Sequence, residues 1–185
     1  MNKPIIGIVA RDGISKRTDR LIMHIDDAYR RAVIKSGGVP LLIMPIQDAE
    51  YNFEKKEFIP EMSQEEKENL IRVLNNCDGI LLPGGMKIFE YDKFICNYAL
   101  EHNIPILGIC LGMQIMAAID CGPERIIQPI DNGVNHKSED KFIHKVKINK
   151  DSFLYNIVGN EEFSVSSKHK CKITKTNEFD VVRIF

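Results

Sequence analysis

The sequence has no tryptophan, no Cys-x-x-Cys pair and no long apolar run. Stretches such as Leu41–Met44 fall far short of the ~20 apolar residues that a membrane-spanning helix needs. The N-terminal residues also lack the apolar core and the small-residue cleavage site of a signal peptide. From these absences we expect neither an export signal nor membrane association.

Charge of one sign is not in excess either. The 25 Lys and Arg residues against 26 Asp and Glu give a formal net charge of -1, which leaves no overall basic field to attract nucleic acid. The five cysteines are odd in number and lack the spacings typical of a disulfide framework or a zinc knuckle. We therefore expect a cytoplasmic protein that binds no nucleic acid, and no motif indicates a metal or an organic cofactor.

Apolar runs alternate with amphipathic stripes through the first two thirds of the chain. The run at 4–10 is followed by a polar loop, a helical stripe over 24–35 that includes Tyr29 and ends at Gly37-Gly38, and a second apolar run at 39–44. This order predicts a right-handed parallel β-α-β unit. The same reading predicts strands at 78–83 and 105–109, and helices at 92–101 and 111–119.

The alternation as a whole predicts an open, doubly wound α/β sheet. Ser63 and Glu66 have the spacing of a capping box at the start of a further helix. After Gly122 the alternation weakens, and the strands predicted there span 124–128, 142–148 and 163–166. With no linker and no internal repeat, residues 1–185 are predicted to form a single domain.

A cysteine between two glycines lies where the strand at 105–109 meets the next helix. Gly108-Ile109-Cys110-Leu111-Gly112 has the form of a nucleophile elbow, which exposes a nucleophile at the carboxyl end of a sheet. The sharp turn strains the backbone, so glycines two residues away on either side avoid clashes. The helix N-terminus would stabilise a thiolate, and the Leu111 N–H would point at the oxygen of a tetrahedral intermediate. The alternative is a small buried thiol beside glycines that serve only packing.

A second glycine motif ends the strand before it. In Leu82-Pro83-Gly84-Gly85 the chain leaves an apolar strand with backbone N–H groups that can approach a ligand closely. By itself this is a turn signal. Parallel strands end at one edge of a sheet, so we expect Gly84 and Gly85 near Cys110, where their N–H groups would complete an oxyanion hole.

Together these motifs resemble the class I glutamine amidotransferase superfamily, whose fold is flavodoxin-like α/β, a doubly wound, mostly parallel sheet with helices on both faces. The segments at 3–8 and 29–41 are similar to the stand-alone gamma-glutamyl hydrolases, above all to the bacterial gamma-glutamyl-gamma-aminobutyrate hydrolases. The resemblance is strongest from Pro4 to Gly122. An unrelated α/β fold with an elbow cysteine would not explain Leu82–Gly85.

The resemblance implies a catalytic nucleophile and its oxyanion hole. The family hydrolyses gamma-glutamyl amides with a cysteine–histidine–glutamate triad, which makes Cys110 the nucleophile that forms a gamma-glutamyl thioester. Its oxyanion donors would be the backbone N–H groups of Gly84, Gly85 and Leu111.

Substrate contacts are implied in the same way. Gln114 matches the position that holds the amino-acid end of the glutamyl substrate. The stretch from Val165 to His169 resembles a family Val-Asn-Ser-x-His segment that lines the mouth of the active site, so Ser167 and His169 are expected to contact substrate. Ser166 here replaces the family's asparagine, which leaves the identity of the substrate open.

The family's catalytic histidine and glutamate come from a later His-Pro-Glu segment, and this sequence contains no His-x-Glu. We therefore expect a single amidotransferase-like domain without its C-terminal catalytic segment, the histidine and glutamate lying beyond Phe185. Among the local histidines, His136 and His169 are the candidates to substitute. For His169, a plain surface histidine is an equally good reading.

Three functions fit the sequence. The first is a thiol hydrolase of gamma-glutamyl peptides or glutamine, a cysteine-dependent enzyme of the class I amidotransferase type. The second is a degenerate, non-catalytic family member that binds a gamma-glutamyl metabolite or a partner. The third is a glutaminase subunit that supplies ammonia to a separate synthase. A small-molecule gamma-glutamyl substrate and a homodimer are expectations from the family.

Overall fold

The computed structural model describes residues 2–52, 54, 59, 61–122, 127–129, 144–165 and 171–173. By its internal contacts the chain divides into two compact units, Met1–Ile119 and Asp120–Phe185, and each is described by itself. Ser167, His169 and His136 lie outside the described residues. The expectation of a single domain stays a prediction.

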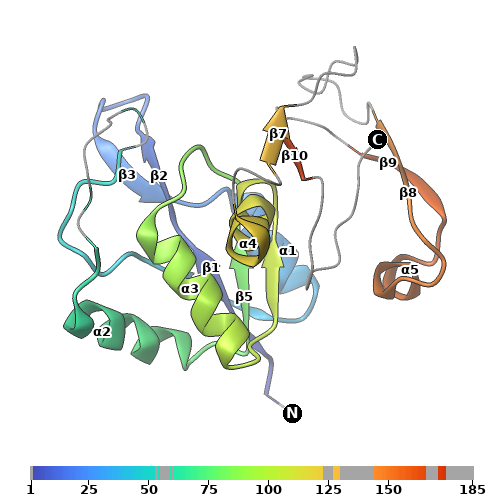
Figure 1. Ribbon diagram of the computed structural model, residues 1–185, viewed down its shortest axis with the longest axis horizontal. Coiled ribbons are helices and arrows are strands. Elements are labelled where there is room, and N and C mark those ends of the chain that lie inside the picture. Colours follow the sequence, from blue (N-terminus) through green and yellow to red (C-terminus); the bar gives the residue numbers. More distant parts are fainter. Residues whose placement is uncertain are drawn as a thin grey trace. The chain divides into compact units, whose positions relative to one another are not determined.

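Four parallel strands form the central sheet of the first unit (Figure 1): β1 (Ile5–Val9), β4 (Val39–Ile43), β5 (Gly79–Leu82) and β6 (Ile106–Gly108). Their order across the sheet is β4-β1-β5-β6. Counted along the chain, the second strand lies outside the first and the third and fourth follow on the other side. This is the flavodoxin-like order, so the predicted α/β fold is confirmed.

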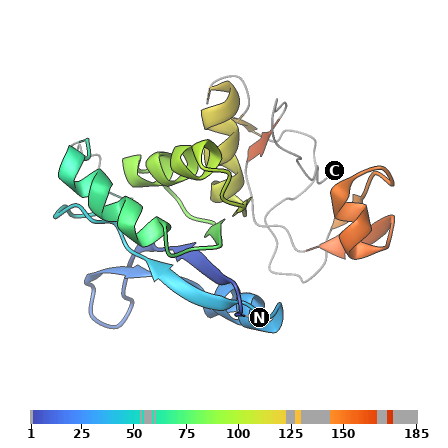
Figure 2. The same ribbon diagram turned by 90° about the horizontal axis from the view of Figure 1, so that it is seen from below.

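Four helices flank this sheet: α1 (Asp27–Lys35), α2 (Gln64–Leu74), α3 (Glu90–Glu101) and α4 (Leu111–Cys121). Helices cover both faces, as predicted (Figure 2). The division follows from the alternation of side chains along each strand, which sends successive residues to opposite faces.

Two separate apolar clusters show which helix covers which face. On one face, the β-strand residues Ile8 and Leu81 pack with Val33 of α1. The other face buries a larger cluster, in which the three helices α2, α3 and α4 pack against strand residues; it includes Val9, Ile80, Leu82, Leu70, Ile95, Leu111 and Ile115. The start of α4 is thus anchored in the main core.

A β-hairpin replaces the polar loop predicted after β1. Strands β2 (Arg11–Ile14) and β3 (Leu21–His24) pair antiparallel. The helix predicted from residue 24 therefore begins three residues later, because the backbone of His24 pairs with Arg11 in the hairpin. Asp26 has extended backbone, and its carboxylate accepts a hydrogen bond from the Ala28 N–H at 2.8 Å, which caps α1.

Two predicted helix ends are confirmed. Ser63 and Glu66 form the capping box at the start of α2, each side chain accepting a hydrogen bond from the other residue's backbone N–H. At the end of α1, Gly37 adopts the left-handed conformation with φ 88°. Its N–H and that of Gly38 donate to carbonyls of the last turn, so the chain leaves the helix at the predicted glycines.

The described residues of the second unit form two antiparallel strand pairs and one short helix. Strand β8 (His144–Lys147) pairs with β9 (Glu162–Val165), and β7 (Ile127–Pro129) pairs with β10 (Cys171–Ile173). The three strands predicted after Gly122 are thereby confirmed in their described parts, whereas β10 and helix α5 (Phe153–Val158) were not predicted. No helix among the described residues has both the length and the apolar character to cross a membrane.

Candidate active site

The two glycine motifs leave the sheet side by side. Strands β5 and β6 are parallel, and Leu82, the last residue of β5, lies opposite Gly108, the last residue of β6. The Ile109 N–H extends this pairing by donating to the Leu82 carbonyl at 2.9 Å. The loops that follow both strands therefore start as neighbours at the carboxyl edge, where open α/β sheets bind ligands.

Cys110 forms a strained turn between β6 and α4. Its φ is 54°, a left-handed value that costs a residue with a side chain of the order of 1 kcal/mol. The turn is closed by the Gly112 N–H, which donates to Ile109, and by the Gln114 N–H, which donates to the Cys110 carbonyl at 3.1 Å. The side chain of Cys110 is exposed. The predicted elbow is thus present, with the thiol outside the core.

Both elbow glycines are required by close packing. A Cβ atom on Gly108 would lie 2.6 Å from the carbonyl carbon of Gly112, and one on Gly112 would lie 2.0 Å from the carbonyl oxygen of Leu82. Neither distance is compatible with a real atom, and the obstructing atoms are backbone. The first turn of α4 therefore rests directly on the end of β5.

Gly84 passes directly against the cysteine. A Cβ atom on Gly84 would lie 3.4 Å from the Cβ of Cys110 and 3.9 Å from its Sγ. The Gly84 N–H donates a hydrogen bond of 3.2 Å to the hydroxyl of Tyr29, which belongs to the first turn of α1. The sequence placed Tyr29 on the apolar stripe of that helix but gave no sign of this contact.

Gly85 and Leu111, the other two predicted donors, are also neighbours. A Cβ atom on Gly85 would lie 2.8 Å from Cδ2 of Leu111. Leu111 is buried and is the first residue of α4, where backbone N–H groups have no partner inside the helix. Gln114 follows one turn later and is half-buried. The structure thus gathers Cys110, the two glycines and the start of α4, whereas Ser167 and His169 lie outside the described residues.

A buried ion pair anchors the backbone carbonyl that precedes the two glycines. The guanidinium of Arg11 donates from Nε and Nη2 to the carbonyl of Pro83, at 3.3 and 3.0 Å, and its Nη1 pairs with Asp92. The second carboxylate oxygen of Asp92 accepts from the Phe89 N–H at 3.0 Å. Both charged residues are buried, with 5% and 0% of their surface exposed. Sequence alone could not pair them, since 81 residues separate them.

The buried position of this pair sets its electrostatics. Burial raises the pKa of Asp92 above its ordinary value, and the adjacent Arg11 guanidinium opposes that rise. Asp12, next to Arg11, has one carboxylate oxygen that is buried and has no hydrogen-bond partner among the described residues. The positive charge of Arg11 therefore offsets the cost of burying the Asp92 carboxylate beside Asp12.

The other cysteines of the first unit are less exposed than Cys110. Burial raises the pKa of Cys96 to about 12, and it also raises the pKa of the half-buried Cys77. Neither thiol ionises readily near neutral pH. Both thiols are therefore suited to packing rather than to nucleophilic chemistry.

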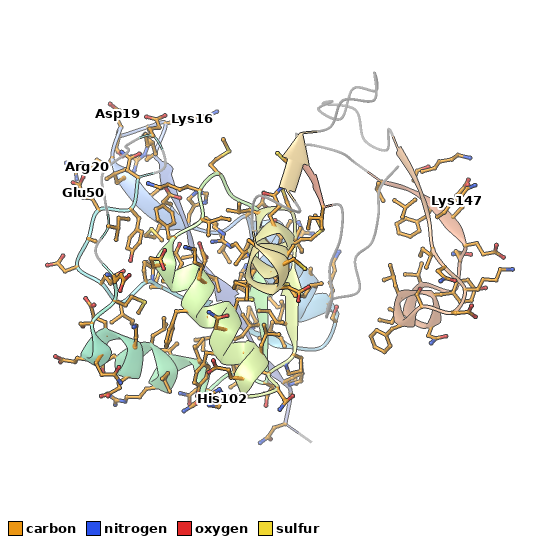
Figure 3. All side chains as sticks on the ribbon, viewed as in Figure 1. Lys16, Asp19, Arg20, Glu50, His102 and Lys147 are labelled. Carbon is orange, nitrogen blue, oxygen red and sulfur yellow. The ribbon has the colours of Figure 1, made fainter. Side chains whose placement is uncertain are left out.

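His24 and His102 are the histidines whose side chains the structure describes. Among the described contacts, neither forms a hydrogen bond with Cys110. His102 ends α3, where its ring stacks on Tyr98 at 3.9 Å and its Nδ1 lies 2.9 Å from the Tyr98 carbonyl. Figure 3 shows His102 at the opposite end of the first unit from Lys16 and Asp19, which lie in the hairpin that follows β1. Among the described residues, no group of three or more His, Cys, Asp and Glu side chains could hold a metal ion.

The model of the peptidase C26 family matches residues 88–183, which is more than half of the chain and contains Cys110. The chain belongs to the peptidase C26 family. It is thereby a member of the class I glutamine amidotransferase-like superfamily, as the sequence resemblance indicated. This family is one of cysteine hydrolases and amidotransferases. The matched stretch begins after Gly85, so Arg11, Tyr29 and the glycine loop lie outside it.

Individual relatives match over shorter stretches. The chain is 38% identical over 79 residues to the CTP synthase of Lactobacillus delbrueckii subsp. bulgaricus, covering 40% of this chain and 14% of that protein. It is 35% identical over 119 residues to the CTP synthase of Latilactobacillus sakei subsp. sakei, covering 60% and 21%. The chain thus spans at most about a fifth of these relatives' length. A glutamine amidotransferase structure from Methylobacillus flagellatus superposes with a TM-score of 0.49 and 13% identity, covering 93% of this chain and 57% of that one.

Replacing Gly112 by Ala should disrupt the elbow. The added methyl group would collide with the Leu82 carbonyl, and since backbone cannot give way cheaply, we expect a loss of at least about 1–3 kcal/mol in unfolding free energy. Gly37→Ala is the matched control, because Gly37 is left-handed but has open space around it. It should cost only about 1–2 kcal/mol of backbone strain and leave alkylation of Cys110 unchanged. Urea unfolding and iodoacetamide labelling measure both effects; equal labelling of Cys110 in the two variants would contradict this packing.

Replacing Arg11 by Met should make stability strongly pH-dependent. Asp92 would stay buried without its cation, so we expect a loss of about 3–5 kcal/mol in unfolding free energy near neutral pH. Burial would then raise the Asp92 pKa unopposed, above its ordinary value of 3.8. Below about pH 4 the carboxyl is neutral in both folded and unfolded chains, so the penalty is small there and grows as pH rises through the raised pKa.

The control for this pH dependence is the double variant Arg11→Met with Asp92→Asn. It has no carboxylate at that position, so the part of the pH dependence that comes from Asp92 should disappear. Denaturant unfolding across about pH 4–8 gives the comparison. Parallel stability curves for the single and double variants would mean that Asp92 does not depend on Arg11.

Proposed function

We propose that this protein is a thiol hydrolase of gamma-glutamyl amides, either gamma-glutamyl peptides or glutamine, that acts through a Cys110 thioester. The observation that carries the proposal is the elbow. Cys110 is exposed, adopts φ 54° at the start of α4, and has the Gly84 backbone against its side chain. A thiol placed for packing alone would not need a strained backbone and two glycines without room for a Cβ atom.

The proposed first step is acylation of the cysteine. The Cys110 thiolate attacks the gamma-carbonyl carbon of the substrate, a C–S bond forms, and the carbonyl electron pair moves onto oxygen. Backbone N–H groups of Leu111 and the Gly84-Gly85 loop are the proposed donors to that oxyanion. When the intermediate collapses, the C–N bond breaks and the amine leaves with a proton. Water then hydrolyses the thioester, which releases glutamate and returns the thiol.

Proton transfer needs a base and an acid near the thiol. The sequence has no His-x-Glu, so we propose that the triad's histidine and glutamate are supplied by residues beyond Phe185. His136 and His169 are the alternatives within the chain, and both lie outside the described residues.

The amino-acid end of the substrate is assigned to Gln114, near the start of α4. Gln114 is placed one turn after Cys110, and its backbone N–H already bonds the Cys110 carbonyl at 3.1 Å. We propose that its side chain binds the glutamyl group, with Ser167 and His169 as further contacts. A cytoplasmic location and a homodimer complete the proposal as family-level expectations.

A second candidate function is favoured by the identity with CTP synthases. In that case the protein is a glutaminase that delivers ammonia to a synthase partner, with the same Cys110 chemistry. Ammonia release from glutamine that rises when a synthase is added would support this candidate. A gamma-glutamyl peptidase would instead turn over its substrate at the same rate without a partner. The third reading, a binding protein without catalysis, gives no turnover in either assay.

Replacing Cys110 by Ala should abolish turnover. With gamma-glutamyl-p-nitroanilide and with glutamine, we expect a loss of kcat of at least about 10³-fold, because no other group can form the thioester. Cys77→Ala is the control, since its half-buried thiol has a raised pKa and is not part of the site. Retained turnover in Cys110→Ala, or its loss in Cys77→Ala with the fold intact, would contradict the assignment.

A further inference from the structure

The hydroxyl of Tyr29 lies at the glycine loop that passes against Cys110. It accepts the Gly84 N–H at 3.2 Å. The position of a Cβ atom on Gly84 lies 3.5 Å from this hydroxyl and 3.9 Å from the Cys110 sulfur, so both groups lie within 4 Å of one point. The phenol and the thiol thus both border Gly84, at the carboxyl edge of the sheet.

The orientation of the phenol is fixed from both sides of one peptide unit. The Pro83 carbonyl and the Gly84 N–H belong to the same planar peptide, in which they point in opposite directions. Arg11 holds the carbonyl with two hydrogen bonds, and Tyr29 receives the N–H. The N–H predicted to bind the oxyanion is therefore engaged by the phenol oxygen.

The phenol oxygen of Tyr29 accepts one hydrogen bond, and its O–H can still donate another. A tyrosine hydroxyl has one proton, which rotates about the C–O bond and can be given to a second group. Among the described residues, none receives this proton from Tyr29. Accepting the Gly84 N–H also polarises the hydroxyl and strengthens it as a donor.

We propose that Tyr29 is a catalytic residue, whose O–H donates a hydrogen bond to the oxyanion that forms when Cys110 attacks the substrate. The inference rests on the proposed function, because it needs the tetrahedral intermediate. The Gly84 N–H, named above as a direct donor, then acts through Tyr29 by holding the phenol, while the N–H groups of Gly85 and Leu111 stay direct donors. The Arg11–Asp92 pair orients the peptide that holds the phenol.

If Tyr29 blocks the oxyanion site instead of donating to it, its removal should not slow turnover. If the phenol merely blocks the Gly84 N–H in the free protein and moves away for substrate, removing its oxygen would free that N–H for the oxyanion. Turnover would then rise or stay unchanged. If the phenol donates, its loss removes one donor, which is typically worth about 10²–10³-fold in rate.

The test is Tyr29→Phe, which keeps the ring on the α1 face of the core and removes one oxygen. With gamma-glutamyl-p-nitroanilide we expect kcat to fall by about 10²-fold while KM changes much less. Tyr98→Phe is the matched control: it removes a tyrosine hydroxyl bonded to Asn75 at 2.7 Å, elsewhere on α3, and should retain the original kcat. Alkylation of Cys110 by iodoacetamide forms no oxyanion, so its rate should be equal in both variants.

Each outcome decides the matter. A fall in kcat of about tenfold or more, with Cys110 alkylation unchanged, supports donation by Tyr29. A smaller fall, no change or a rise overturns it and leaves the proposed function standing. A fall accompanied by altered alkylation means a displaced elbow and also overturns it. Absence of Cys110-dependent turnover in the unmodified protein would overturn the proposed function, and Tyr29 with it.

Discussion

The site depends on how closely helix α4 packs against the end of strand β5. Gly112 rests on the Leu82 carbonyl, where a single added methyl group would come within 2.0 Å. In the turn that makes this approach, Cys110 has a left-handed backbone with φ 54° and an exposed side chain. The strain is compensated by the apolar burial of Leu111 and Ile115, which anchors the helix. A looser helix start would remove both the strain and the exposed thiol.

The same edge of the sheet is completed from distant parts of the chain. Arg11 reaches across 72 residues to the Pro83 carbonyl, and Tyr29 reaches across 55 residues to the Gly84 N–H. One peptide unit is thereby fixed at both of its polar ends. Because an oxyanion hole works by preorganised dipoles, a peptide that cannot rotate is worth more to the reaction than one that must be oriented in each turnover. The buried Asp92 keeps Arg11 in place, at an electrostatic cost that burial makes large.

The sequence predicted the parts of the structure that have a local signal. Alternating apolar runs and helical stripes gave the parallel sheet, and the elbow glycines together with the Pro-Gly-Gly turn gave the neighbourhood of Cys110. The hairpin of β2 and β3 was missed because each strand is only four residues long. The first is mostly polar, and the second is an apolar stretch too short to stand out from the polar residues before it. Arg11 and Asp92 carry no local signal of their pairing, since a buried ion pair is defined only by the fold. Tyr29 was predicted to lie on an apolar stripe, and its ring does pack against the apolar cluster on that face. The sequence pattern gave no indication of the hydrogen bond that its hydroxyl accepts.

The central claim is that Cys110 is a nucleophile that attacks a glutamyl carbonyl. The most direct measurement is mass spectrometry of the purified protein before and after treatment with a glutamine-like electrophile, followed by peptide mapping. One adduct on Cys110, suppressed by excess gamma-glutamyl substrate, is the expected result. No adduct, or modification of other cysteines with Cys110 untouched, would contradict the claim and favour a protein that binds a gamma-glutamyl compound without turning it over.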